Sequence, residues 1–139
     1  MMCRKRRKNC WAIRLFDYLK GNDKIRSFGP WSDADIKYAQ EKLGQTAPDF
    51  IEFVRTFGSA DIHRGFFHFY SGMADLNEHL EGMELPAIKL DAWIFGDGDG
   101  DMGVIDKTTG ECLQIDHEGY EIYSRHNTFT DFINWILKE

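Results

Sequence analysis

Cysteine is scarce in this 139-residue chain, and its three copies are scattered. Cys3 and Cys10 lie too far apart for a Cys-X-X-Cys pair, and Cys112 stands alone. No second cysteine pair or nearby histidine pair completes the four ligands of a structural zinc site. The sequence therefore predicts reduced thiols, no metal centre and a cytoplasmic protein, because disulfide frameworks belong to oxidising compartments.

Long apolar runs are also missing. No stretch approaches the roughly 20 residues that a membrane-spanning helix needs. The N-terminus is basic, but no apolar stretch with a small-residue cleavage site follows it, so we expect no secretory signal. The length suits one domain that buries a real hydrophobic core.

Motifs for catalysis and nucleotide binding are absent as well. The chain contains no GxSxG and no phosphate-binding GxxxxGK[ST] loop, and the three aspartates of its glycine-rich turn at residues 96–103 would repel a phosphate. None of its five histidines has the spacing of an HExxH metal motif. Asp75 and Glu78 stand at helical spacing, but a solvated helix face explains them better than an acid–base pair does. We therefore expect a protein that is not an enzyme and needs no cofactor.

Acidic and basic residues are distributed unevenly along the chain. Residues 1–8 hold five Lys or Arg and no acid, whereas the remainder holds 12 Lys or Arg against 23 Asp or Glu. Such an acidic body repels nucleic acid and attracts basic partners. The basic segment is interpreted as a solvated tail, with contact to RNA or anionic lipid as the alternative.

The apolar pattern predicts helices, then a run of short strands, then a final helix. Helices are expected at residues 11–20, 32–43, 48–57, 74–81 and 128–137, and strands at 66–70, 92–95, 102–106, 112–116 and 120–123. Tight turns between consecutive strands imply antiparallel pairing. We therefore predict an α+β fold, with an antiparallel or mixed sheet of short strands and helices packed on one face.

The N-terminal part is expected to lie outside the main domain. Residues 11–20 place Trp11, Leu15, Tyr18 and Leu19 on one helical face. This face is expected to pack on the body, and a membrane-surface helix is the alternative. Residues 27–31 are predicted to be a linker or turn. The predicted division is a basic tail with an amphipathic helix at 1–31 and an α+β domain at 32–139.

Three aspartates alternate with glycines between two apolar strands, at Asp97, Asp99 and Asp101. They match the first three acidic positions of an EF-hand calcium loop, but Met102 takes the place of its glycine and Thr108 that of its glutamate. Asp-Gly pairs tolerate the left-handed backbone of a tight turn. The pattern therefore favours a β-hairpin, with a weak cation site as the alternative.

Several short motifs, in this order and spacing, resemble the SUKH superfamily over about residues 32–139. The first part has a helix ending in Leu-Gly, a proline followed by an acid and an aromatic, and a helix ending in glycine, at Leu43, Gly44, Pro48, Asp49, Phe50, Phe53 and Gly58. The second part has an aromatic strand, a Gly-Asp turn, a strand ending in Asp and a Thr-Gly turn, at Trp93, Phe95, Gly100, Asp101, Val104, Asp106, Thr109 and Gly110. An aromatic-rich final helix follows, with Thr128, Phe129 and Phe132.

This resemblance implies an α+β fold without enzymatic activity. Bacterial members of the superfamily are mostly immunity proteins, which bind and neutralise a toxin, often a nuclease. We therefore expect a protein partner, most simply a basic toxin domain, which the acidic body would attract. The residues expected to contact this partner are Asp75, Glu78, Glu81, Glu84, Asp97, Asp99 and Asp101. The alternatives are an adaptor tethered through the N-terminal segment and a calcium-binding protein that uses the Asp-Gly turn.

Overall fold

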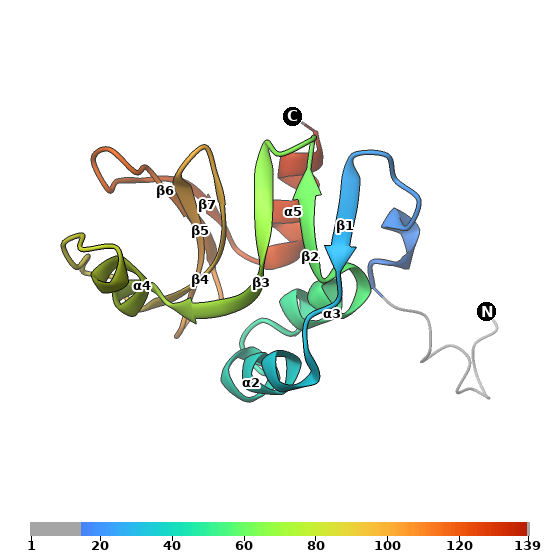
Figure 1. Cartoon of the computed structure of the whole chain (residues 1–139), viewed down its shortest axis with the longest axis horizontal. Coiled ribbons are helices and arrows are strands. Elements are labelled where there is room, and N and C mark those ends of the chain that lie inside the picture. Colours follow the sequence, from blue (N-terminus) through green and yellow to red (C-terminus); the bar gives the residue numbers. More distant parts are fainter. Residues whose placement is uncertain (1–14, 139) are drawn as a thin grey trace.

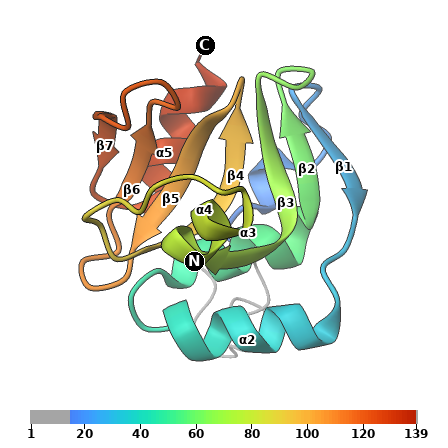
Figure 2. The same cartoon turned by 60° about the vertical axis from the view of Figure 1, so that its left-hand side comes forward.

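One seven-stranded antiparallel sheet forms the centre of the computed structural model, which describes residues 15–138. Its elements in chain order are η1 (Asp17–Leu19), β1 (Ile25–Gly29), α2 (Asp33–Leu43), α3 (Pro48–Phe57), β2 (Ser59–Ile62), β3 (Phe67–Asp75), α4 (Leu76–Gly82), β4 (Ala92–Gly98), β5 (Asp101–Asp106), β6 (Cys112–Ile115), β7 (Ile122–His126) and α5 (Phe129–Leu137). The strands lie side by side in sequence order, as Figure 2 shows. The predicted α+β class and antiparallel sheet are confirmed.

Helices cover both faces of the sheet, which differs from the expectation of one covered face. Figure 2 shows α3 and α5 behind the sheet and α4 in front of it. The reason lies in β4, which is buried from Ala92 to Gly96. Alternate side chains of a strand point to opposite faces, so a continuous apolar run needs cover on both. Ile94 accordingly belongs to the core cluster under α4, whereas Phe95 belongs to the cluster under α3 and α5.

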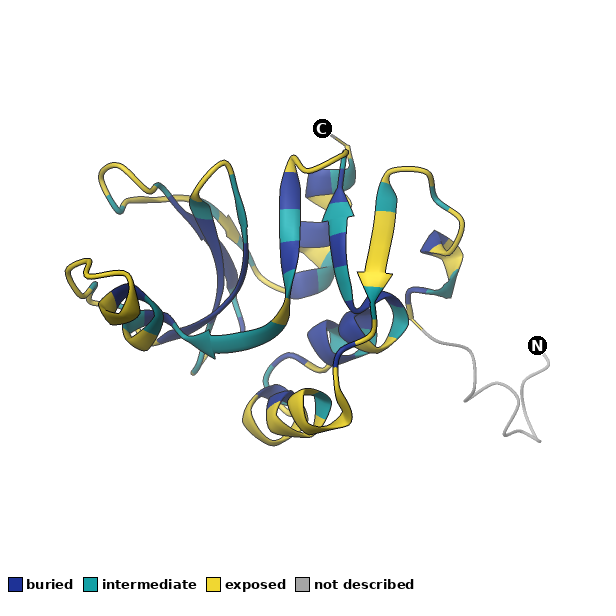
Figure 3. Cartoon of the chain, in the orientation of Figure 1, coloured by how far each residue is buried: buried dark blue, intermediate teal, exposed yellow. Residues whose placement is uncertain are grey.

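The larger core is built mainly from aromatic side chains between the sheet and α3 and α5. Phe50 and Phe53 of α3 lie with ring centroids 5.2 and 5.3 Å from Phe129 of α5. Phe95 of β4 lies 5.6 Å from the same ring. Figure 3 colours all buried residues dark blue, including those of this core. Pairs at such distances and inclined angles add stability beyond the apolar area they bury.

Residues 15–31 belong to the same fold as the rest of the described chain, which differs from the predicted boundary at residue 32. Strand β1 pairs with β2, where a linker was expected. Phe16 and Leu19 are buried in the larger core, while Leu15 and Tyr18 are exposed. Packing on the body is thus confirmed for the described part, but of the predicted face only Leu19 is buried there. Residues 15–20 form turns and the 3₁₀ helix η1 where an α-helix was expected, and Trp11 and the basic tail lie outside the described residues.

The side chains of Ser32 and Thr128 cap the starts of α2 and α5. The Ser32 side chain accepts a hydrogen bond from the backbone N–H of Asp35 at 3.1 Å, which begins α2. The Thr128 side chain accepts one from Asp131 at 3.1 Å, which begins α5. Each bond satisfies a backbone donor that a helix start leaves unpaired. Within residues 15–138 no helix is long and apolar enough to cross a membrane.

Strand β3 bends sharply in its middle. Its pairing with β4 jumps from Phe69 opposite Gly96 to Ala74 opposite Ile94, so the intervening segment bulges out of the ladder. Figure 1 shows the second half of β3 turning away towards α4. Bulges redirect the side chains that they carry. Tyr70 is the first residue of this bulge, and its ring points into the site described below.

Candidate functional site

The Asp-Gly turn joins β4 and β5 as a tight hairpin. Gly98 pairs with Asp101, and the two residues between them, Asp99 and Gly100, have φ of 55° and 87°. Two successive residues with positive φ are typical of a type I′ turn, which matches the twist of antiparallel strands. The predicted hairpin is confirmed.

The three aspartates of this turn do not converge on a common point. Asp97 Oδ2 accepts a hydrogen bond from the Tyr70 hydroxyl at 2.7 Å. Asp101 instead binds His117 and Tyr123, and Asp99 is exposed at the tip of the turn. The three carboxylates therefore do not surround one position, as the ligands of a calcium-binding loop do.

One group among the described residues has the spacing of metal ligands, and it contains only one of those aspartates. Asp101, Asp116 and His117 bring their ligand atoms within 4.8 Å of one another. The same atoms already serve the turn: Asp116 accepts backbone N–H bonds from Glu118 and Gly119, and Asp101 accepts from His117. These bonds explain the cluster as part of the turn at residues 116–120.

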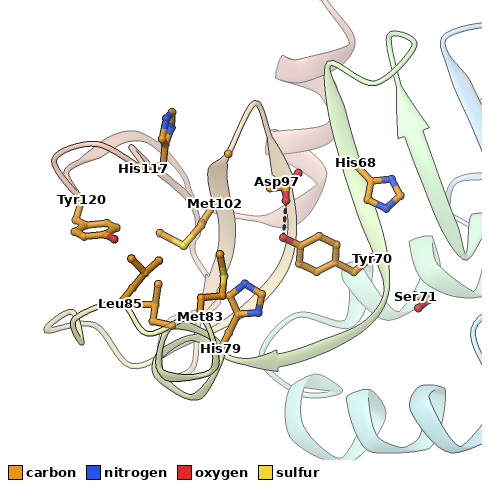
Figure 4. A pocket seen from close by; sticks show the side chains of 12 residues that line it. His68, Tyr70, Ser71, His79, Met83, Leu85, Asp97, Met102, His117 and Tyr120 are labelled. Atoms are coloured by element: carbon orange, nitrogen blue, oxygen red, sulfur yellow. Dashed lines mark hydrogen bonds between the residues drawn. The ribbon is translucent and has the colours of Figure 1, made fainter.

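A groove of about 760 Å³ opens on the α4 side of the sheet, and we take it as the candidate site. It lies between the bulge of β3, α4 with the loop after it, the hairpin tip and the turn at residues 117–120. Figure 4 shows the side chains gathered around this space. Its larger side chains are Tyr70, Leu80, Met83, Leu85, Met102 and Tyr120. Its polar side chains are His68, Ser71, His79, Asp97 and His117.

Apolar side chains make much of the groove wall. Leu80 and Met102 are buried beneath it, whereas Met83 is 56% and Leu85 37% exposed. Both exposed side chains follow α4 in a loop that turns back through the bond from the N–H of Leu85 to the carbonyl of Leu80. Exposed apolar side chains that gather at a groove mark a binding surface more often than scattered ones do.

The polar end of the groove is formed by Tyr70 and Asp97. The β3 bulge places the Tyr70 ring beside His79 of α4, with centroids 6.1 Å apart and the rings nearly parallel. Burial, together with the hydrogen bond to Asp97, raises the pKa of the Tyr70 hydroxyl well above its usual range. This hydroxyl therefore stays protonated and donates to the carboxylate, which fixes Asp97 at the groove wall.

His117 forms the opposite wall and is held by Asp101. Its Nδ1 lies 2.7 Å from Asp101 Oδ1, and its backbone N–H donates to the same oxygen at 3.1 Å. The hydrogen bond and the charge of Asp101 raise the pKa of the His117 imidazole. Partial burial would raise the pKa of Asp101, but the bonds from His117 and Tyr123 outweigh it and lower it.

The residues predicted for partner contact fall into three groups. Asp97 lines the groove, and Asp101 positions His117 in its wall. Glu78, Glu81 and Glu84 are exposed on α4 and the loop after it, and Asp99 is exposed at the hairpin tip. Asp75 is only partly exposed, because it caps α4 and forms an ion pair with Lys107.

Sequence reasoning missed most of the groove residues. Tyr70, His79, Met83, Leu85 and Tyr120 come from separate segments, and no local spacing links them. The one available signal was the pair of large apolar side chains in the loop after α4, outside any predicted element. Only the bend of β3 and the return of that loop bring these segments together.

Negative charge is concentrated in the part of the chain that builds α4, the β4–β5 hairpin and the turn at residues 116–120. Residues 75–121 contain 13 Asp or Glu and only two basic side chains, Lys89 and Lys107. The remainder of the chain contains 10 Asp or Glu against 15 Lys or Arg. The acidic excess of the whole protein therefore belongs to the segment that builds α4, the hairpin and most of the groove.

Comparison of the chain with models of known protein families, with curated proteins and with solved structures finds no match in any of the three.

Proposed function

We propose that this chain is a non-enzymatic protein-binding module of the immunity type, which binds and neutralises a basic toxin domain. The observation that carries the proposal is the concentration of 13 acids against two bases in residues 75–121. This segment also supplies most of the groove, so the acidic excess and an apolar contact surface come from the same stretch of the chain. Protein interfaces commonly combine an apolar centre with a polar rim.

The charge has a direct physical consequence for association. A strongly acidic surface steers a basic partner into contact and raises the association rate, more so at low ionic strength. Toxins that cleave nucleic acid carry basic surfaces that hold phosphates. An acidic protein bound to such a surface would exclude the substrate. The resemblance to the SUKH superfamily supports the same function through the order and spacing of its motifs.

The test is co-expression with a toxin encoded beside the gene for this chain. We expect the wild-type protein to restore growth of cells that produce the toxin. Restored growth together with a stable complex of the two purified proteins supports the proposal. Failure to restore growth and to bind would refute the pairing.

A charge-reversal pair locates the contact surface. Glu81→Lys with Glu84→Lys changes two exposed acids beside the groove, and Asp23→Lys with Glu41→Lys makes the same change in charge elsewhere. We expect the first pair to slow association about tenfold or more at low salt, and the control pair to have a clearly smaller effect. Equal effects of the two pairs would show that net charge alone matters, without a contact surface near α4.

A further inference from the structure

We propose that the groove between α4 and the sheet binds one segment of the partner that combines a large apolar side chain with an adjacent Lys or Arg. The apolar side chain would lie between Met83, Leu85 and Met102, and the cation would pair with Asp97. This inference rests on the proposed function, because it names the chemistry of the partner that the acidic surface attracts.

The apolar half follows from the groove wall. Met83 and Leu85 are exposed at its mouth, and Leu80 and Met102 are buried at its base. Figure 4 shows Met83, Leu85, Met102 and Tyr120 directed towards one space. Methionine adapts its shape to different apolar ligands. Full burial of one large aliphatic or aromatic side chain there should strengthen binding by about ten- to a hundredfold.

The cationic half follows from Asp97. Its Oδ2 accepts a hydrogen bond from the Tyr70 hydroxyl, and within residues 15–138 its Oδ1 has no side-chain donor and can accept one from a ligand. Among residues 15–138 no lysine or arginine forms an ion pair with Asp97, whereas Asp75 and Glu111 each have one. A carboxylate held in a partly buried wall without a cation of its own favours a positively charged ligand group.

Acidic residues around the groove also favour a positively charged ligand. Glu84 follows Met83 directly, and Asp116 and Glu118 flank His117. The Tyr120 ring also lines the groove, and an aromatic ring attracts an ammonium or guanidinium group. An acidic peptide would meet repulsion from each of these carboxylates, so the groove discriminates by charge as well as by shape.

Methionine methyl groups report on the groove directly. Met83 and Met102 line it, whereas Met73 packs against the larger core and serves as an internal control. The protein is labelled with ¹³C-methyl methionine, and its methyl NMR signals are followed during titration with a nine-residue peptide that carries leucine flanked by arginines. We expect the signals of Met83 and Met102 to shift and that of Met73 to stay.

Two altered peptides separate the two halves of the proposal. Replacement of the arginines by glutamates removes the cations, and replacement of the leucine by glycine removes the apolar anchor. We expect each change to weaken binding at least tenfold. The proposal is overturned if the basic peptide leaves Met83 and Met102 unmoved at millimolar concentration, or if the acidic peptide moves them equally.

Variants of the protein complete the test. Asp97→Asn removes the charge but keeps an oxygen acceptor for Tyr70, and Asp23→Asn is the matched control at an exposed acid outside the groove. We expect about tenfold weaker binding of the basic peptide for Asp97→Asn and no change for the control. Met83→Gln removes apolar surface at an exposed position without adding charge, so it should weaken binding of the leucine-bearing peptide and tests the groove independently of Asp97→Asn.

The outcomes separate this inference from the proposed function. A toxin that is still neutralised by Asp97→Asn and by Met83→Gln refutes the groove as the contact but leaves the immunity function intact. Peptide binding in the groove without neutralisation of any neighbouring toxin refutes the immunity function and keeps the groove specificity.

Discussion

The Asp49 carboxylate accepts two hydrogen bonds from Thr130, one from its backbone N–H at 2.8 Å and one from its hydroxyl at 2.7 Å. These residues are 81 positions apart in the chain and stand in the first turns of α3 and α5. The contact therefore fixes the starts of the two helices that cover the larger core. Asp49 belongs to the Pro-Asp-Phe motif on which the SUKH resemblance rests, and the structure gives this aspartate a structural role.

Removal of this carboxylate should destabilise the fold. Asp49→Ala leaves the partly buried N–H and hydroxyl of Thr130 without their acceptor, so we expect a loss of about 1–3 kcal/mol in the free energy of unfolding. Asp49→Asn keeps one acceptor oxygen and should lose less. Urea denaturation measures both, with Glu41→Ala as an exposed control near zero. A loss for Asp49→Ala no larger than that of the control would contradict this role.

Asp75 serves both a helix cap and an ion pair. Its carboxylate accepts the backbone N–H of Glu78 at 3.0 Å, pairs with Lys107 and so anchors the start of α4. The Lys107 ammonium also lies 4.2 Å from the centroid of the Trp93 ring. We expect Asp75→Ala to lose about 1 kcal/mol from the cap alone and more from the pair. Asp75→Asn keeps a capping oxygen and should cost less in the same urea titration.

The pair also predicts a pH dependence. The hydrogen bond from Lys107 lowers the pKa of Asp75. A carboxyl whose folded pKa is depressed contributes stability above its unfolded pKa and loses it as the pH falls through the folded value. The stability difference between wild type and Lys107→Met should therefore be present at neutral pH and shrink in acid. A difference that is constant from neutral pH to acid would contradict the pairing.

The regular parts of this fold were predictable because their cores depend on local periodicity. Phe50, Phe53 and Phe57 repeat at helical spacing, and all three are buried in α3. The hairpin was predictable because Asp-Gly is one of the few pairs that adopt its turn. These signals lie within short windows of sequence, where the spacing of apolar residues reflects the geometry of a single helix or strand.

The missed parts depend on contacts between distant segments. Strand β1 is an edge strand whose middle residues Arg26, Ser27 and Phe28 are all exposed, so it lacks the alternation of a half-buried strand. Its place is set by pairing with β2. In this pairing Gly29 lies opposite Ser59, which is 30 residues later in the chain. The groove was missed for the same reason, since its walls meet only after β3 bends.

The ion pair between His117 and Asp101 predicts a shifted histidine titration. The Asp101 hydrogen bond raises the pKa of His117. A histidine with a raised folded pKa contributes stability below its unfolded pKa and loses it as the pH rises through the folded value. NMR titration should show His117 with a pKa above the ordinary 6.5. Asp101→Asn should return it towards that value, and an unchanged titration would contradict the pair.

Gly100 has left-handed backbone in the turn of the β4–β5 hairpin. Its φ is 87°, and a Cβ added there would lie 3.3 Å from the His117 ring. An L side chain in left-handed backbone costs roughly 1–2 kcal/mol, so we expect Gly100→Ala to lower the free energy of unfolding by about that amount. The same substitution should disturb the wall of the groove, because His117 must move to make room.

Gly82 offers the matched control for this substitution. It ends α4 with no heavy atom within 4 Å of an added Cβ and with no positive φ. Alanine there restricts the unfolded chain without strain, so Gly82→Ala should stabilise the protein by up to about 1 kcal/mol. Thermal melting compares the two variants, and the Met102 methyl signal should shift only in Gly100→Ala. If Gly82→Ala lost as much stability as Gly100→Ala, the loss at position 100 could not be attributed to the geometry of the turn.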